Sequence, residues 1–140
     1  MSLKVGAIAV TPPVLLAPMA GLTDRPFRGL VQRFGAGLVV SEMVASGEFL
    51  TERPSARARA EIAAGEGGTS VQIAGREAAP MAEAARRLAG EGAPIIDINM
   101  GCPAKKVTSG ASGAALMRDP DHALSLIEAV VAAVDVPVTL

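Results

Sequence analysis

The chain has 140 residues, half of them hydrophobic, which is enough to build one globular domain with a sizeable core. Its net charge of −1 supplies no global basic field to attract nucleic acid, and its single cysteine excludes both an internal disulfide framework and a cysteine-rich zinc site. No apolar stretch reaches the roughly 18 residues that span a bilayer, so we expect a cytoplasmic protein with no membrane partner and no metal.

Five short apolar runs have the composition of β-strands. Most are apolar at every position rather than at alternate ones, which is typical of parallel strands covered on both faces. In chain order they cover residues 14–18, 37–43, 69–75, 94–100 and 136–140.

Helical periodicity fills the segments between these runs. The first helix begins at a cap formed by Thr23 or Asp24 and stops at Gly35. Its apolar positions are Phe27, Leu30, Val31 and Phe34. A weaker helical pattern covers residues 49–64 and is broken at Pro54.

Two clearer helices follow. One opens with Pro80 and ends at Gly90, and the other has Asp119 as its N-cap and Pro120 at its first position. The apolar stripe of the last helix consists of Leu124, Ile127, Val131 and Val134.

The alternation of strand and helix indicates an α/β fold with a parallel sheet. A doubly wound sheet and a (β/α)8 barrel both fit this order. The turn after the first strand, APMAGLTD, lacks the glycine-rich phosphate-binding fingerprint of a Rossmann sheet. A closed barrel needs about 250 residues, so a barrel would be unfinished at the fifth strand.

Polar residues gather where the apolar strands end, and ligands of such folds bind beyond these carboxyl ends. Gln72 lies in the third run, and Asp97 and Asn99 share one face of the fourth. These side chains form either a satisfied polar layer of the core or contacts to a ligand. A flat heterocycle with alternating donors and acceptors would satisfy such amides.

Cys102 directly follows the fourth run, between Gly101 and Pro103. It is either a small buried hydrophobe or a functional thiol. An unperturbed thiol, with a pKa around 8.5, is mostly protonated at neutral pH, which suits a proton donor better than an attacking thiolate. Lys105 and Lys106 are either solvated or placed to meet phosphates.

Arg25 and Arg28, near the end of the first strand, add weakly to a phosphate-binding interpretation.

Five motifs resemble those of the tRNA-dihydrouridine synthases, particularly their bacterial type-B-like branch. They are LAPMAGLTDRPFR (16–28), SEM (41–43), VQIAG (71–75), DINMGCPAKKV (97–107) and DVPVTL (135–140). The resemblance extends from about Leu15 to the last residue. It implies an FMN-containing (β/α)8 barrel that reduces uridine in tRNA to 5,6-dihydrouridine with NADPH as reductant, and residues 1–140 are then the N-terminal part of that barrel.

The resemblance also implies roles for individual residues. Those assigned to FMN are Pro18, Met19, Ala20 and Gln72. Asn99 is expected to contact the target uracil, and Cys102 to be the general acid that protonates carbon five as hydride reaches carbon six. Lys105 and Lys106 are expected to lie beside the RNA backbone.

Two other interpretations stay open: an FMN barrel that reduces a free pyrimidine or an enone, as dihydroorotate-dehydrogenase-like proteins do, and a non-catalytic RNA-binding fragment. The family's next flavin-contacting lysine, its FMN phosphate site and its C-terminal helical domain are expected after Leu140, where this chain ends. We therefore expect the 140-residue piece to be inactive alone and to self-associate through its open sheet edges.

Overall fold

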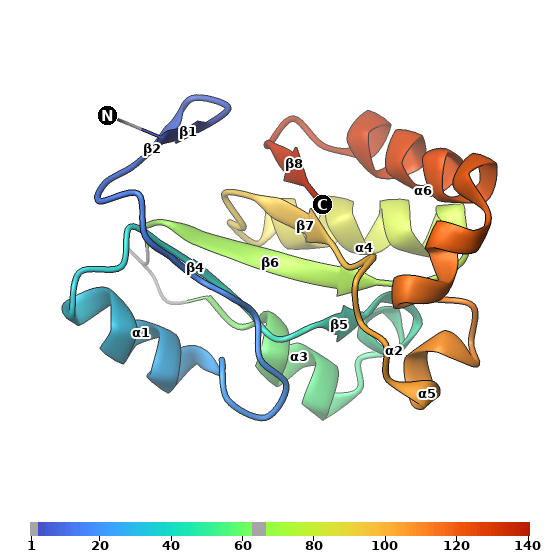
Figure 1. Ribbon diagram of the computed structural model, residues 1–140, viewed down its shortest axis with the longest axis horizontal. Coiled ribbons are helices and arrows are strands. Elements are labelled where there is room, and N and C mark those ends of the chain that lie inside the picture. Colours follow the sequence, from blue (N-terminus) through green and yellow to red (C-terminus); the bar gives the residue numbers. More distant parts are fainter. Residues whose placement is uncertain (1–2, 63–66) are drawn as a thin grey trace.

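The computed structural model describes residues 3–62 and 67–140 and is built around an open parallel sheet (Figure 1). Its strands lie side by side in the order β3 (Leu15–Leu16), β4 (Leu38–Val40), β6 (Thr69–Ala74), β7 (Ile96–Ile98) and β8 (Val138–Thr139), and β5 (Val44–Ala45) also pairs with β6. This confirms the α/β fold with a parallel sheet. Because the strand order follows the chain without reversal, the sheet is not doubly wound.

Helices connect the strands. They are α1 (Arg25–Arg33), α2 (Ser46–Leu50), α3 (Pro54–Ala60), α4 (Ala78–Gly90), α5 (Lys105–Thr108), the 3-10 helix η1 (Gly113–Arg118) and α6 (Pro120–Ala133). Right-handed crossovers that always step in the same direction place their helices on one face of a sheet. On that face the main core joins alternate strand residues, Val71 and Ile73 of β6, to buried residues of α2, α3, α4 and α6.

Local capping chemistry fixes the helix starts. The Asp24 side chain accepts a hydrogen bond from the Phe27 main-chain N at 3.0 Å, and Asp119 accepts one from the His122 main-chain N at 3.1 Å. Both caps follow the prediction. The helix predicted to open at Pro80 begins two residues earlier, at Ala78. Pro54 opens α3, since proline lacks only an N–H that the first turn does not use.

The predicted apolar stripes of α1 and α6 do not coincide with their buried faces. In α6 the buried residues are Ala123, Leu126 and Val130, whereas Leu124 and Val131 are about half exposed. Of the stripe predicted for the first helix, Leu30 of α1 and Phe34, which directly follows α1, are exposed, Phe34 by 85%. Part of each predicted apolar stripe is therefore not covered by other described residues.

The predicted strand 37–43 is interrupted. β4 ends at Val40, and Ser41 still donates its main-chain N–H to the Ser70 carbonyl at 2.9 Å. The Ser41 side chain then replaces a backbone acceptor, because its Oγ accepts from the Gln72 main-chain N at 3.0 Å. Pairing with β6 resumes in β5, so a hydroxyl bridges the break.

The antiparallel hairpin formed by β1 (Leu3–Val5) and β2 (Ile8–Val10) was not predicted. It packs through Val10 against Leu38 and Ile95, which lie just at or before the amino ends of β4 and β7. Gly37 makes this approach possible, since a Cβ there would lie 2.1 Å from the Pro12 carbonyl oxygen. The hairpin therefore closes the end of the sheet opposite the carboxyl ends.

Gly37→Ala is expected to lower the free energy of unfolding by about 2–3 kcal/mol, because the added methyl group meets backbone that must move. Gly29→Ala, inside α1 with nothing within 4 Å of the new Cβ, is the matched control and should be stabilising by about 0.5–1 kcal/mol. Thermal unfolding midpoints of the two variants test this. Equal midpoints would contradict the close approach at Gly37.

Candidate active site at the carboxyl ends of the strands

A row of polar side chains crosses the sheet on the face opposite the main core. Gln72 of β6 pairs in register with Asp97 of β7, and Asp97 pairs with Thr139 of β8. On β6 and β7 the residues that alternate with this row, including Ile73 and Ile98, belong to the helix-covered core. Gln72 is nearly buried, with 6% of its surface exposed.

Hydrogen bonds join this row into one chain. Thr139 Oγ1 donates to Asp97 Oδ1 at 2.5 Å, and Gln72 Nε2 donates to Asp97 Oδ2 at 2.6 Å. Asn99 Nδ2 donates to Gln72 Oε1 at 2.9 Å, and the Cys102 main-chain N donates to Asn99 Oδ1 at 3.1 Å. We call these five residues the polar chain. It brings together four residues singled out in the sequence: Gln72, Asp97, Asn99 and Cys102.

The Cys102 turn is held from both sides. Its main-chain N is bound to Asn99, and its carbonyl accepts from the Ala114 main-chain N at 3.0 Å. Gly113, with φ of +59°, lies so close that a Cβ there would be 2.6 Å from the Cys102 carbonyl oxygen. Cys102 is half-buried and belongs to neither apolar cluster, which does not fit a residue that only fills the core.

The loop after β3 is also tied down. The Met19 main-chain N donates to Thr23 Oγ1 at 3.0 Å, and Thr23 is fully buried. The Gly21 main-chain N donates to Glu42 Oε2 at 3.0 Å, and the same oxygen lies 3.5 Å from Arg59 Nε. Pro18, Met19 and Ala20, the other residues expected at FMN, therefore lie on a loop of fixed shape.

A groove with a volume of about 790 Å³ lies beside this loop. Its lining includes Ala20, Glu42, Arg53, Arg59, Arg76 and Lys106. We call it the rim groove, since these residues follow β3, β4 and β6 or lie in and between the short helices beyond them. Lys106 thus lines a cavity at the carboxyl ends, whereas Lys105 is exposed beside it at the start of α5.

The structure corrects the weak phosphate interpretation for Arg28, and it pairs Arg25 with a carboxylate. Arg28 is fully buried and donates to the main-chain carbonyls of Thr23 at 3.0 Å and Glu61 at 2.6 Å. Arg25 forms an ion pair with the Glu61 carboxylate at 2.5 Å. Both arginines join α1 to the segment after α3 and are occupied by protein groups.

A family model described as dihydrouridine synthase (Dus) matches residues 15–140. The chain belongs to the dihydrouridine synthase family. It is 72% identical over its whole length to a probable tRNA-dihydrouridine synthase of Rhodobacter capsulatus, of which it covers 44%. It is 51% identical, over 99% of its length, to tRNA-dihydrouridine synthase B of Xanthomonas campestris, of which it covers 42%. The chain thus spans less than half the length of these curated relatives.

These findings confirm the resemblance seen in the sequence. The dihydrouridine synthase motifs now have places in the structure: VQIAG carries Gln72 in β6, DINMGCP carries Asp97, Asn99 and Cys102, and DVPVTL carries Thr139. Sequence reasoning missed Thr139 as a member of the polar chain. Aligning the parallel strands would have found it, because Thr139 lies level with Asp97 on the neighbouring strand.

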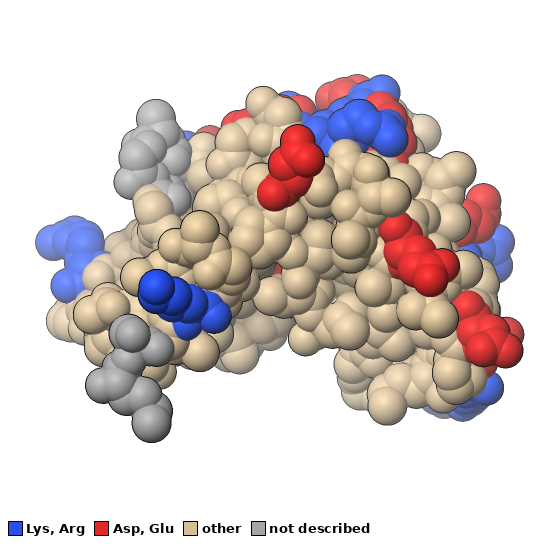
Figure 2. Space-filling model, turned by 90° about the horizontal axis from the view of Figure 1, so that it is seen from above, with Lys and Arg blue, Asp and Glu red and all other residues tan. Residues whose placement is uncertain are grey.

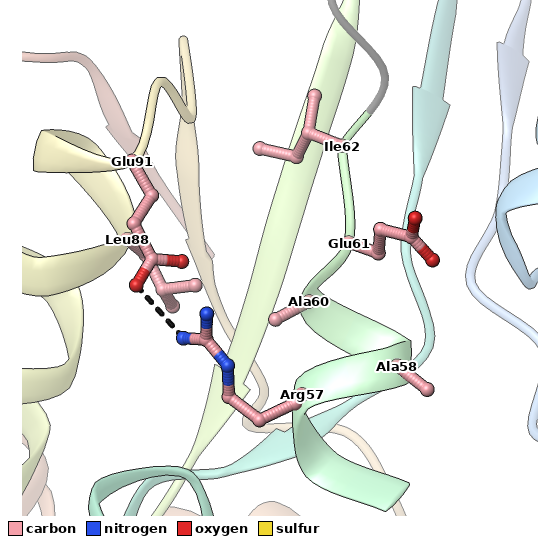
Figure 3. Close-up of a pocket in the computed structure, with 7 residues that line it drawn as sticks. All are labelled: Arg57, Ala58, Ala60, Glu61, Ile62, Leu88 and Glu91. Carbon is pink, nitrogen blue, oxygen red and sulfur yellow. Dashed lines mark hydrogen bonds and ion pairs between the residues drawn. The ribbon is translucent and has the colours of Figure 1, made fainter. Parts of the chain in front are cut away.

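A second hollow, of about 410 Å³, lies on the other side of the sheet, between α3 and α4 (Figure 3). Arg57 and Glu91 point toward each other across it, and Arg57 Nη1 lies 2.8 Å from Glu91 Oε1. This hydrogen bond raises the pKa of Arg57 above its usual value. Its lining residues end α3 and α4, near the amino ends of the strands, and it is therefore separate from the polar chain.

Charge is dispersed over one face of the described residues (Figure 2). Figure 2, a view onto the hairpin and α6 side, shows acidic and basic side chains interspersed, with no extended basic patch on that face. Within residues 3–62 and 67–140, no group of three or more histidine, cysteine or acidic side chains is placed to hold a metal ion. None of the described helices is long and apolar enough to cross a membrane.

Proposed function

We propose that the complete protein reduces uridine in tRNA to 5,6-dihydrouridine, with FMN as cofactor and NADPH as reductant. Residues 1–140 then form the first five strands of its (β/α)8 barrel, and the polar chain faces the barrel interior. The observation that carries this proposal is the polar chain itself, which ends at the Cys102 turn at the carboxyl ends of the strands. Enzymes of this fold have their active sites at that end.

The donor set of the polar chain fits a flavin ring. After its bonds to Asp97 and Asn99, the Gln72 amide keeps one hydrogen and one lone pair for a ligand with alternating donors and acceptors. Pro18, Met19 and Ala20 would contact FMN through the tied loop after β3. When bound, FMN supplies the hydride that adds to carbon six of uracil, and NADPH restores it.

Cys102 supplies the proton in this proposal. Hydride addition at carbon six leaves an electron pair on carbon five, and the Cys102 Sγ–H bond breaks as its proton forms the new C–H bond there. Asn99 keeps one amide hydrogen after binding Gln72, and this hydrogen is available to the uracil. General acid catalysis of this kind contributes typically about 10²- to 10⁴-fold.

The target base must leave its stack to reach such a site. Lys106 in the rim groove and Lys105 beside it are then placed to meet phosphates of the RNA backbone. Both lie on α5, which follows the Cys102 turn directly, so RNA contacts and proton donor would be carried by one short segment.

Gln72→Ala in the complete protein is expected to weaken FMN retention, because it removes the amide that would otherwise satisfy polar edges of the flavin. The molar ratio of flavin to protein after gel filtration measures this. Ser70→Ala is the matched control, since Ser70 lies two residues away on the same face of β6 and its Oγ has no hydrogen-bond partner among the described residues. An unchanged ratio and absorbance for Gln72→Ala would make Gln72 a core amide only.

The test of the proposed function is flavin reoxidation without oxygen. Reduced complete protein should be reoxidised by unmodified tRNA and far more slowly by free uracil or an enone. Equal rates with free uracil would favour a free-pyrimidine reductase. A colourless complete protein that binds tRNA would favour the non-catalytic alternative.

A further inference from the structure

We propose that Asp97, fixed by Thr139, is a positioning residue that sets the direction of the polar chain and thereby the groups that Gln72 and Asn99 present to a ligand. The hydrogen bonds of the polar chain are observed whatever ligand the site binds. Only the identity of the ligand, FMN and uracil, rests on the proposed function.

The hydrogen-bonding capacity of the two ends of the polar chain, Asp97 and the Cys102 main-chain N–H, sets the direction in which its hydrogen bonds run. Asp97 accepts at both oxygens, from Thr139 Oγ1 and from Gln72 Nε2. At the other end, the Cys102 main-chain N–H can only donate. An acceptor at one end and a donor at the other leave the intervening amides one consistent orientation.

Each amide is therefore turned by its neighbour. Gln72 directs Nε2 to Asp97, so its Oε1 faces Asn99. Asn99 therefore has to donate from Nδ2 to this oxygen. The Asn99 Oδ1 is then left for the Cys102 N–H, 3.1 Å away. Reversing Gln72 would place two acceptors together at Asp97 and two donors together at Asn99, and a buried donor without an acceptor is destabilising.

Thr139 holds the carboxylate in place. Its hydroxyl lies 2.5 Å from Asp97 Oδ1, from the neighbouring strand and in register with it. With Oδ1 occupied, Oδ2 is the oxygen turned to Gln72. The donors and acceptors offered by Gln72 and Asn99 thus depend on two residues that need not touch the ligand.

Asp97→Leu removes the acceptor, and Asp97→Asn tests the direction. In the asparagine variant, Oδ1 can still face Gln72 if Nδ2 donates to the Thr139 hydroxyl, which can also accept. Adding Thr139→Val removes the acceptor that orients the asparagine amide, because valine has no hydroxyl. Ile98→Val, on the core face of β7, is the control for a general loss of stability.

Two readouts on the complete protein, neither depending on turnover, distinguish positioning from folding. They are the FMN dissociation constant from flavin fluorescence and the rate at which iodoacetamide alkylates Cys102 in flavin-free protein. Asp97→Leu and the double variant Asp97→Asn, Thr139→Val should each weaken FMN binding by about tenfold, the loss of one good hydrogen bond, and alkylate faster. Asp97→Asn alone should stay near the wild type, as should Ile98→Val.

The proposal is overturned if Asp97→Leu matches the wild type in both readouts, or if Asp97→Asn is as impaired as the double variant. Should Asp97→Leu not fold, the comparison of Asp97→Asn with the double variant decides. A wild-type protein that binds FMN yet never reduces tRNA would refute the proposed function and leave these differences intact.

Discussion

Cys102→Ala in the complete protein is expected to slow tRNA-dependent flavin reoxidation by about 10²-fold or more. The reason is that alanine removes the Sγ–H proton and little else. Both hydrogen bonds that hold the turn come from main-chain atoms, the N–H to Asn99 and the carbonyl from Ala114. FMN should therefore remain bound at its wild-type ratio, and stopped-flow absorbance of the flavin measures the rate.

Cys102→Ser is the matched control for this loss. It keeps a donor of similar position and lower acidity, so its rate should lie between those of the alanine variant and the wild type. If Cys102→Ala reoxidises at the wild-type rate, the thiol is not the general acid, and the polar chain then serves only to bind the flavin.

The isolated 140-residue chain is expected to form dimers or larger assemblies at micromolar concentration, with weak or no FMN binding and no turnover. Its edge strands β3 and β8 each pair with a single neighbour. At one edge the exposed apolar side chains are Leu15 of β3, Leu30 of α1 and Phe34, which follows α1. Near β8 they are Leu140 and, on α6, Leu124 and Val131. Open strand edges flanked by exposed apolar side chains recruit partners.

Light scattering coupled to gel filtration tests this expectation. Phe34→Asp should shift the distribution toward monomer, because Phe34 is 85% exposed. Ala79→Asp, at an exposed position in the first turn of α4, adds the same charge away from both edges and should not. A soluble, compact monomer of the unsubstituted chain would show that these edges do not drive association.

Much of the fold could be predicted because it depends on local chemistry. Asp24 and Asp119 cap their helices as expected, and the third and fourth apolar runs contain β6 and β7. Alternation along a strand also placed Asp97 and Asn99 on the same side, which their shared contact with Gln72 bears out.

What could not be predicted depends on contacts between distant segments. The exposure of Leu124 and Phe34 depends on which surfaces the rest of the chain covers, and periodicity alone does not say this. The hairpin β1–β2 is short and is held by packing against Leu38 and Ile95. Predicting the polar chain requires knowing how β6, β7 and β8 align, which local sequence does not show. Thr139, for example, lies 42 residues after Asp97 in the sequence.

The central proposal is tested most directly by the mass of the uridines in tRNA after incubation with the complete protein and NADPH. Unmodified tRNA should yield a nucleoside heavier than uridine by two hydrogen atoms. In heavy water the hydrogen added at carbon five should be a solvent deuteron, because Cys102 would deliver its exchangeable proton there. Uridine of unchanged mass, from a protein that carries FMN and is reduced by NADPH, would contradict the proposed reaction.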